Sequence, residues 1–450
     1  MFITSKKRRR VVYIASESLA KISARLPSNR GRAVLVHGLA SSLGLLANLA
    51  GTRDAAHEEH DVDDLAEDED SESGGDESTS IRVLRPELAA EDDLLSFHDT
   101  DLVERLLSGQ DAEPNDAGYG LEDDCAPFPG MREYVLAVAG ASLAAARELV
   151  EGRADVSICW DGGRHHAHKS RVSGFCYVND CVLAILALRR LRPPPHPPAT
   201  TGPSISRPKL ERARVMYLDL DLHYGDGVAG AFCGPNRAKS SNVLTLSIHH
   251  AARGFFPLAP CTPDLLSSEP THAASGAGPL ATEDDPYSLT IPLHAGASAR
   301  TYAAIWPGVE AVAHAFVPHA VVVQCGVDAL AGDPCAVGNW CLGGEGGLGW
   351  CIRRVIDEWG CKVLLLGGGG YNSPNAARAW AYLTSIAKGE PLSLETHIPD
   401  HAAFPAYAPS FTLDVPAGNA RDQNDEAYVQ RLADELGNAA EVLRSRGAGV

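Results

Sequence analysis

The sequence lacks features that would place it in several protein classes. It has no uninterrupted apolar run of about 18 residues, the length that spans a membrane. Its first 15 residues, MFITSKKRRRVVYIA, contain no apolar stretch of a secretory signal. It has no CxxC pair, and its 11 cysteines are an odd number, some within apolar runs, as at Cys159 and Cys325. We therefore expect a soluble intracellular protein with reduced, buried thiols.

Basic residues are also scarce: 39 Lys and Arg stand against 58 Asp and Glu, a formal net charge of −19. No basic stripe is present, which excludes a general nucleic-acid binder and favours basic partners. Twelve of the acidic residues fall between Glu58 and Glu77, so the remaining chain carries about −7. The basic cluster from Lys6 to Arg10 is either a nuclear localisation signal or the ordinary flanking charge of a first strand.

Apolar, β-branched runs alternate with Ala- and Leu-rich stretches of helical length. The predicted strands are 11–15, 156–160, 215–221, 243–249, 287–293, 320–326 and 363–369. The predicted helices are 33–50, 131–150, 178–191, 301–316 and 374–388. This alternation predicts an α/β fold, a three-layer α/β/α arrangement with a mainly parallel central sheet. Ligands of such folds collect at the carboxyl ends of the strands.

Three segments interrupt the alternation, which resumes after each. Residues 52–80 are acidic and too poor in apolar side chains to fold alone, residues 192–212 are Pro-rich, and residues 261–286 are polar and Gly-rich. We interpret all three as insertions into a single catalytic domain over 11–415, followed by a partly helical tail over 416–450. No internal repeat is apparent.

Two motifs at strand ends indicate a metal site. In DLDLHYGDG (219–227), strand alternation would direct Asp219, Asp221 and His223 to one face, where an Asp-x-His pair can hold a cation. In QCGVDALAGDP (324–334), Asp328 could add a second carboxylate. Two carboxylates and one imidazole with an open position are typical of a catalytic metal site. The alternatives are a polar strand end and, for Asp333 more than Asp328, a turn cap.

Two further motifs supply acid–base and electrophilic groups. WDGGRHHAH (160–168) places two adjacent histidines on a loop after a strand, where they serve either acid–base chemistry or a solvated turn. GGGGY (367–371) permits close backbone approach, and the Tyr371 hydroxyl can donate to a developing oxyanion. No Lys-Ser/Thr follows these glycines, which excludes a P-loop.

Taken together, the motifs resemble those of a known family. WDGGRHHAHKSRVSGFCYVND, DLDLHYGDG, RGFFP, CGVDALAGDP and GGGGYN, in this order, closely resemble the class I histone deacetylases, whose fold is of the arginase/deacetylase type. The likeness runs from about residue 11 to about 415, apart from the insertions. SLAKI near the start and SGFCYVNDCVLAIL favour the eight-like branch.

The resemblance implies an active site with one zinc ion. Asp221, His223 and Asp328 match the zinc ligands, and one coordination position is left for water and the substrate carbonyl. Residues that match the acid–base and oxyanion machinery are His166 (general base and acid), His165 (its neighbour), Asp219 and Asp226 (carboxylates that hold the two rings) and Tyr371 (donor to the oxyanion).

The resemblance also implies a substrate tunnel and product cavity. Gly174, Phe175 and Phe256 match the tunnel walls, Gly369 and Cys335 lie at matching pocket positions, and Asp124 matches a rim aspartate that holds the substrate backbone. Arg32 matches an arginine of the cavity that takes the acetate product. Structural K⁺ is expected as well, because Asp219, Asp221, His223 and Ser247 match the family's monovalent cation sites.

Four positions depart from the family pattern. Tyr224 replaces the second histidine of the usual HHGDG, and His168 stands where lysine is usual. Cys335 replaces a Leu or Met, either as a small apolar residue or as an oxidisable thiol. His294 stands where complex-forming members tend to carry an arginine for inositol phosphate, which argues against an obligate corepressor partner and leaves membership of a corepressor complex open.

The expected function is therefore hydrolysis of acetyl-lysine on proteins, histones by analogy, in the nucleus and cytoplasm, with a role in transcription. A second hypothesis is a ureohydrolase of the arginase type, which needs further ligands for two manganese ions and no tyrosine after the glycines. A third is a scaffold that binds acyl-lysine without turnover, which predicts loss of a catalytic group. A polyamine deacetylase would need acidic gatekeeping at the rim, for which Asp124 is the one candidate.

Overall fold

A computed structural model describes residues 9–46, 81–109, 116–192, 212–233, 242–257, 281–282 and 285–447. Of the predicted insertions, 52–80 lies outside these residues, and 192–212 and 261–286 lie mostly outside them. Lys6, Lys7 and Arg8 of the basic cluster lie outside them as well. Within the described part, no helix combines the length and apolar character that crossing a membrane requires.

Nine strands of the described chain form one sheet in the order β2-β1-β3-β9-β8-β4-β5-β7-β6. Their bounds are β1 (Val11–Ile14), β2 (Arg82–Leu84), β3 (Val156–Cys159), β4 (Val215–Asp219), β5 (Val243–His250), β6 (Ala281–Thr282), β7 (Asp285–Leu293), β8 (Ala320–Gln324) and β9 (Lys362–Leu366). All neighbours pair in parallel except β6 with β7. Each of the seven predicted strands is present.

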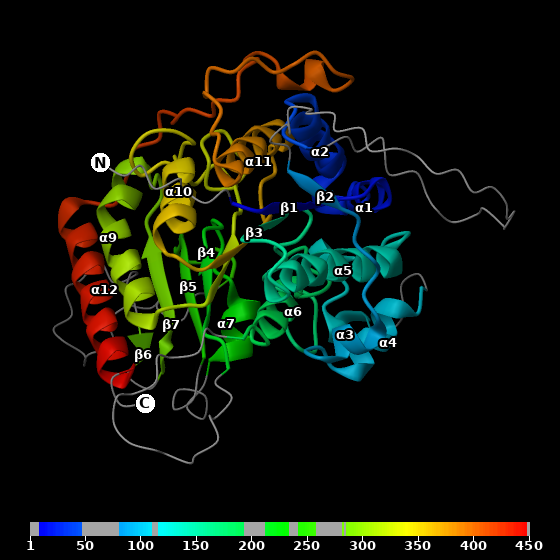
Figure 1. Cartoon of the computed structure of the whole chain (residues 1–450), viewed down its shortest axis with the longest axis horizontal. Coiled ribbons are helices and arrows are strands. Elements are labelled where there is room, and N and C mark those ends of the chain that lie inside the picture. Colours follow the sequence, from blue (N-terminus) through cyan, green and yellow to red (C-terminus); the bar gives the residue numbers. More distant parts are fainter. Residues whose placement is uncertain are drawn as a thin grey trace, which may run out of the picture.

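Helices cover both faces of this sheet (Figure 1). Their bounds are α1 (Glu17–Ser23), α2 (Arg32–Ser42), α3 (Glu91–Leu95), α4 (Thr100–Leu107), α5 (Met131–Val150), α6 (Asp180–Leu188), α7 (Asp226–Phe232), α9 (Ala299–Phe316), α10 (Leu348–Glu358), α11 (Ser373–Lys388) and α12 (Glu426–Gly447). Short 3₁₀ turns are η1 (Pro27–Asn29), η3 (Asp116–Tyr119), η4 (Asp123–Cys125) and η6 (Phe404–Tyr407). The predicted three-layer α/β/α fold is confirmed.

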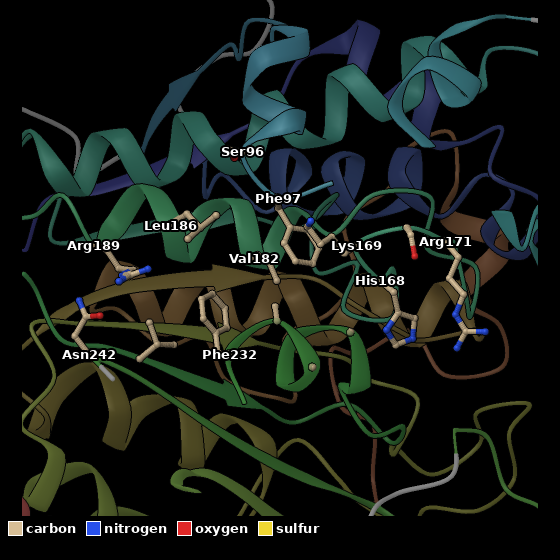
Figure 2. Close-up of a pocket in the computed structure, with 15 residues that line it drawn as sticks. Ser96, Phe97, His168, Lys169, Arg171, Val182, Leu186, Arg189, Phe232 and Asn242 are labelled. Atoms are coloured by element: carbon tan, nitrogen blue, oxygen red, sulfur yellow. The ribbon is translucent and has the colours of Figure 1, made fainter. Parts of the chain in front are cut away.

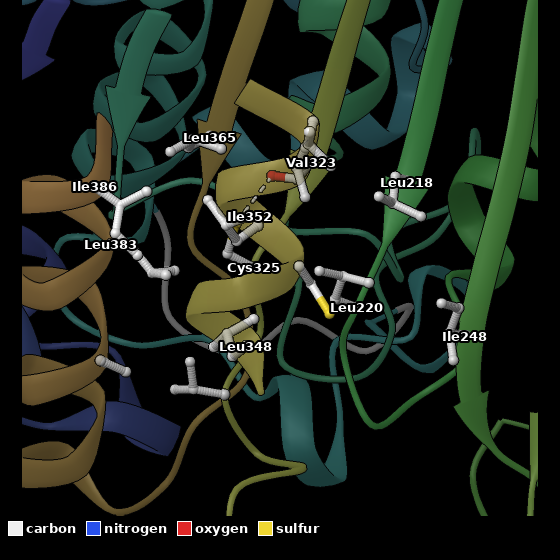
Figure 3. Packing of buried hydrophobic residues seen from close by; sticks show 14 of the residues in the cluster. Leu218, Leu220, Ile248, Val323, Cys325, Leu348, Ile352, Leu365, Leu383 and Ile386 are labelled. Carbon is white, nitrogen blue, oxygen red and sulfur yellow. Dashed lines mark hydrogen bonds between the residues drawn. The ribbon is translucent and has the colours of Figure 1, made fainter. Parts of the chain in front are cut away.

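Strand side chains alternate between two cores because the strands are buried on both faces. Met216 and Leu218 of β4 join the core under α2, α9, α10, α11 and α12, whereas Val215 and Tyr217 join the core under α5, α6 and α7. Figure 3 shows the first core, where Ile352 of α10 and Leu383 of α11 pack over strand residues such as Leu365. Burial on both faces holds the strand ends in place.

Several predicted elements end a few residues earlier than expected. The helix predicted over 33–50 ends at Ser42, because Gly44 adopts a left-handed φ of 67° and the Leu45 N–H turns back to the Ala40 carbonyl. The strand predicted over 215–221 ends at Asp219. Asp221 and His223 therefore reach the site from a turn, not by strand alternation.

Candidate active site

The predicted site residues meet at the carboxyl edge of the central strands. β9 lies between β3 and β8, and β4 follows β8. The chain segments after these four strands carry the His-rich loop, Gly367 to Tyr371, Asp328 and the turn after β4. Because parallel strands end at the same edge, motifs more than 200 residues apart come together.

Two aspartates shape the turn after β4. The Asp221 N–H donates to Asp219 Oδ1 at 3.1 Å, and the His223 N–H donates to Asp221 Oδ1 at 3.0 Å. Such local carboxylate-to-backbone bonds offer the chain an alternative to the sheet ladder. They replace the alternation expected from the sequence and still bring His223 back over Asp221.

Asp221, His223 and Asp328 converge on one point. His223 Nδ1 lies 3.2 Å from Asp221 Oδ1 and 2.9 Å from Asp328 Oδ2. The carboxylates are almost fully buried, at 1% and 0% exposure. Gly369 is tightly apposed, since a Cβ there would lie 2.2 Å from Asp328 Oδ2 and 2.9 Å from Asp221 Oδ2. No described lysine or arginine pairs with either carboxylate.

The electrostatics of this cluster favour a bound cation. Burial raises the pKa of Asp328, and the negative charge of Asp221 adds to the effect. Burial works against protonation of His223, but its hydrogen bonds with Asp221 and Asp328 raise its pKa to about 10. The carboxylates thus stabilise positive charge between them, and a metal with oxygen and nitrogen ligands supplies such charge. The donor set fits zinc.

Gln324 holds Asp221 in place, a role that sequence reasoning missed. Its Nε2 donates to Asp221 Oδ2 at 2.8 Å, and its Oε1 accepts the Gly326 N–H at 2.8 Å. The Gly369 N–H also donates to Asp221 Oδ2, at 2.8 Å. A glutamine at the end of a strand carries no motif, so only its place beside β4 could have indicated this role.

The two adjacent histidines each hold a carboxylate. His165 Nδ1 lies 2.8 Å from Asp219 Oδ2, and His166 Nδ1 lies 2.8 Å from Asp226 Oδ1. Their ring centroids are 3.9 Å apart. Both histidines and Asp219 are buried, whereas Asp226 begins α7 and is partly exposed.

Their environments favour opposite protonation states. Burial disfavours charge on His165, but Asp219 and Asp221 raise its pKa to about 9. Burial and the positive charge of His165 lower the pKa of His166 to about 4. His166 is therefore neutral near pH 7, with its Nδ1–H available to donate to Asp226 and its Nε2 able to accept a proton.

Tyr371 is positioned through Asp333, which the sequence indicated only as a turn cap. Asp333 Oδ2 accepts the backbone N–H groups of Tyr371 at 2.7 Å and Asn372 at 3.2 Å. Its Oδ1 accepts the Cys335 N–H at 3.0 Å. One buried carboxylate thus ties the loop after β8 to the loop after β9. Burial and the charge of Asp328 raise the pKa of the Tyr371 hydroxyl well above its usual value, which keeps it a proton donor.

The predicted tunnel walls stand around the histidines. Gly174 has a φ of 53°, and a Cβ there would lie 2.5 Å from the His166 ring, so only glycine fits. The Phe256 ring lies 5.0 Å from His166, and the Phe175 ring lies 5.9 Å from Tyr371. Phe255, which sequence reasoning missed, stacks on His223 at 5.1 Å. Phenylalanine rings thus stand beside His166, His223 and Tyr371.

Arg32 and Asp124 differ in their burial and contacts. Arg32 is 3% exposed, its Nη1 donates to the Gly370 carbonyl at 2.9 Å, and it lines a small internal cavity with Trp160 and Trp380. Asp124 is exposed on η4 and makes none of the contacts that join the other predicted residues. Ser247 is the register partner of Asp219 across β4 and β5, beside the predicted K⁺ ligands.

Three residues that depart from the family pattern, Tyr224, His294 and Cys335, are partly or fully buried by neighbouring side chains. Tyr224 is 6% exposed, with its ring 4.9 Å from His249. The His294 N–H donates to Asn424 Oδ1 at 2.8 Å, and the His294 carbonyl accepts a hydrogen bond from Asn424 Nδ2 at 3.1 Å. The His294 ring centroid lies 4.5 Å from that of Tyr428, so the C-terminal tail packs against His294. Cys335 is partly buried, and burial, with Asp328 and Asp333, raises its thiol pKa. The ten cysteines of the described chain are free thiols.

His168 joins the site to a separate groove. Its Nε2 lies 3.2 Å from Asp226 Oδ2, the carboxylate that holds His166. Figure 2 shows the groove, of about 630 Å³, in which His168 and Arg171 lie at one end and Arg189 and Asn242 at the other. None of the metal-facing residues lines it.

Comparisons with known proteins identify the family of the chain. Residues 62–387 match the family described as the histone deacetylase domain. The chain is 37% identical to Histone deacetylase 8 of Xenopus laevis over 80% of this chain and 99% of that protein. It is 32% identical to Histone deacetylase 8 of Danio rerio over 97% of this chain and 96% of that protein. It is 35% identical to Histone deacetylase 2 of Oryza sativa subsp. japonica over 78% of this chain and 61% of that protein. The predicted resemblance, including the eight-like branch, is confirmed.

Proposed function

The chain belongs to the histone deacetylase family and is a protein-lysine deacetylase, and from this premise we propose that it works with one zinc ion held by Asp221, His223 and Asp328. The observation that carries the proposal is the meeting of two buried carboxylates at one imidazole, with no lysine or arginine paired to them in the described chain. The family membership removes the ureohydrolase alternative.

The chemistry divides between the metal and the side chains. When bound, zinc supplies a Lewis acid that polarises a carbonyl and lowers the pKa of water. His166 accepts the proton of the attacking water as that oxygen bonds to the acyl carbon. It then returns the proton to the lysine nitrogen as the C–N bond breaks. The second proton of the water passes from the acid to the amine, so the products are acetate and the lysine ammonium group. Asp226 orients the ring so that Nε2 faces the reaction.

The remaining side chains support these steps. The Tyr371 hydroxyl donates to the oxygen of the tetrahedral species, where its hydrogen bond gains strength as negative charge develops. His165, held by Asp219, contributes positive charge beside His166. The cavity lined by Arg32 offers acetate a cationic partner.

The substrates that we propose are acetylated lysines of histone tails and other proteins. Phe175, Phe256 and Gly174 would enclose the methylene stem and exclude bulkier side chains. Asp124 would hold the substrate backbone from the rim, while K⁺ would occupy the sites near Asp219 and Ser247. By family analogy, we propose that the protein acts in transcriptional regulation, in the nucleus and cytoplasm.

The deciding experiment is release of acetate from an acetyl-lysine peptide by purified protein, before and after zinc removal. We expect activity that a chelator abolishes and that zinc restores. Tyr371→Phe and His166→Ala should each lower kcat by about 100-fold or more, the range seen for lost oxyanion donors and general bases.

Tyr287→Phe is a matched control, because Tyr287 lies on β7 outside the site, and it should keep wild-type activity. A wild type that binds zinc and peptide without turnover would overturn the proposal in favour of an acyl-lysine-binding scaffold, and would direct attention to Tyr224.

A further inference from the structure

Cys335 stands among the metal-facing atoms, and not only at the tunnel wall. Ligand atoms of His223, Asp328 and Cys335 all lie within 4.8 Å of one another. Ligand atoms around tetrahedral zinc are separated by roughly 3.3–3.8 Å, as follows from Zn–N, Zn–O and Zn–S bonds of about 2.0–2.3 Å. The thiol hydrogen-bonds the Asp333 side chain and lies beside His223 and Asp328, so it would reach a metal held there by turning away from Asp333.

The backbone that carries this thiol is held firmly. The Cys335 N–H donates to Asp333 Oδ1, and the Ala336 N–H donates to the Asp333 carbonyl at 2.9 Å. Asp333 is in turn bonded to the backbone of Tyr371 and Asn372. Asp328 and Cys335 thus project from one anchored loop, so the thiol keeps its place beside the ligands.

The donor chemistry suits this position. Zinc accepts Cys sulfur as readily as His nitrogen and Asp oxygen, and four ligands complete its preferred tetrahedron. Asp221, His223 and Asp328 supply three of these ligands. A sulfur ligand would take the fourth position, the one that a catalytic site keeps for water and substrate.

We propose that Cys335 is a reversible fourth ligand of the catalytic metal, bound while no acyl-lysine is present and displaced when the substrate carbonyl enters. This inference rests on the proposed zinc-dependent function. On binding, the S–H bond breaks, its proton passes to solvent, and one water leaves the metal. On displacement, the sulfur leaves the metal and regains a proton from solvent.

Such a ligand would act as a built-in competitor of the substrate. The apparent affinity for acetyl-lysine falls by the fraction of protein whose fourth position is free. The metal, in contrast, is held more tightly between turnovers. Removing the thiol should therefore lower KM and increase the rate at which a chelator extracts zinc.

Cobalt-substituted full-length protein provides a direct test. Sulfur bonded to Co²⁺ gives an intense near-ultraviolet charge-transfer absorption that oxygen and nitrogen ligands do not give. We expect this band in the wild type, its loss on addition of acetohydroxamate, which competes for the open position, and its absence in Cys335→Ala and Cys335→Met. Zinc affinity of Cys335→Ala should fall about tenfold or more, the scale seen when groups that support a metal site are removed.

Cys341→Ala is the matched control. Cys341 is also partly buried, lies six positions along the chain, and directs its Sγ to the Gly343 carbonyl at 3.3 Å. This variant should keep the band and the zinc affinity of the wild type. A wild type that is active with zinc but shows no sulfur band with cobalt would overturn the inference alone. A protein that neither binds metal nor releases acetate would instead overturn the proposed function.

Discussion

The floor of the active site and its tunnel wall are built in different ways. The floor, defined as Asp221, His223 and Asp328, carries two fully buried carboxylates whose oxygens meet a backbone N–H, an imidazole or Gln324. The wall, defined as Gly174, Phe175 and Phe256, makes ring contacts, and Phe256 is 43% exposed. A buried charge is costly unless a hydrogen bond or an opposite charge compensates it, whereas an apolar wall requires only a complementary shape. We therefore expect the floor to govern chemistry and the wall to govern binding.

Among the groups that support the site, the largest effect should come from the carboxylate that ties Tyr371 to this floor. Both oxygens of the Asp333 carboxylate accept hydrogen bonds from backbone N–H groups. In Asp333→Asn, one of these oxygens becomes an NH₂ group, which cannot accept such a bond. We expect kcat to fall by about 10–100-fold, as for groups that orient active-site residues, with a much smaller change of KM. Steady-state kinetics on an acetyl-lysine peptide measures both constants.

Asp425→Asn is the control, because Asp425 also accepts a backbone N–H, from Tyr428, but lies far along the chain at the start of α12. Combining Asp333→Asn with Tyr371→Phe adds a sharper readout. If Asp333 acts through Tyr371, the double variant should be little worse than Tyr371→Phe. Fully multiplicative losses would show that the two residues act independently.

A smaller effect, of a different kind, is expected at the wall. Phe175→Ala removes an aromatic face beside Tyr371 without changing any charge. We expect KM for the acetyl-lysine peptide to rise about tenfold, since losing part of an apolar contact costs about 1–2 kcal/mol, while kcat changes less. Phe404→Ala, which alters a partly buried phenylalanine stacked on Phe411, should leave both constants unchanged. A fall in kcat at constant KM would contradict the division between wall and floor.

An effect of a third kind concerns the support of the histidine loop and appears as pH dependence of stability. His98 Nδ1 bonds the His168 carbonyl at 3.0 Å, and its Nε2 accepts the Asn179 N–H at 3.0 Å, which requires a neutral ring. Burial lowers the pKa of His98 to about 4 from a usual 6.5. The unfolded chain therefore binds a proton first as pH falls. The contribution of neutral His98 to the free energy of unfolding is complete above pH 6.5. It is lost as the pH falls towards 4, by about 1.4 kcal/mol per pH unit at most.

Urea unfolding of the wild type and His98→Gln at pH 7, 6 and 5 measures this contribution. The difference in unfolding free energy between the two proteins should narrow as pH falls, because glutamine does not titrate. A constant difference for His98→Gln would show that the ring is not held neutral.

Much of the fold and site could be predicted because the signals are local. Seven β-branched runs identified seven strands, and the motifs that follow β3, β4, β8 and β9 placed the chemistry at their carboxyl ends. Two short strands, β2 and β6, were missed, since runs of three and two residues carry no periodic signal. The turn after Asp219 was mistaken for strand because carboxylate bonds to the backbone leave the sequence alternation unchanged.

The sequence by itself determined the residue types of the site and the strands that they follow. The tertiary structure alone decided which of these strands are neighbours. With β9 between β3 and β8, Gly369 reaches Asp221 and Asp328, Gln324 reaches Asp221, and Asp333 reaches Tyr371. These contacts join residues 38 to 148 positions apart in the chain. Strand order depends on how both sheet faces are buried by helices, and no local pattern of side chains encodes that choice.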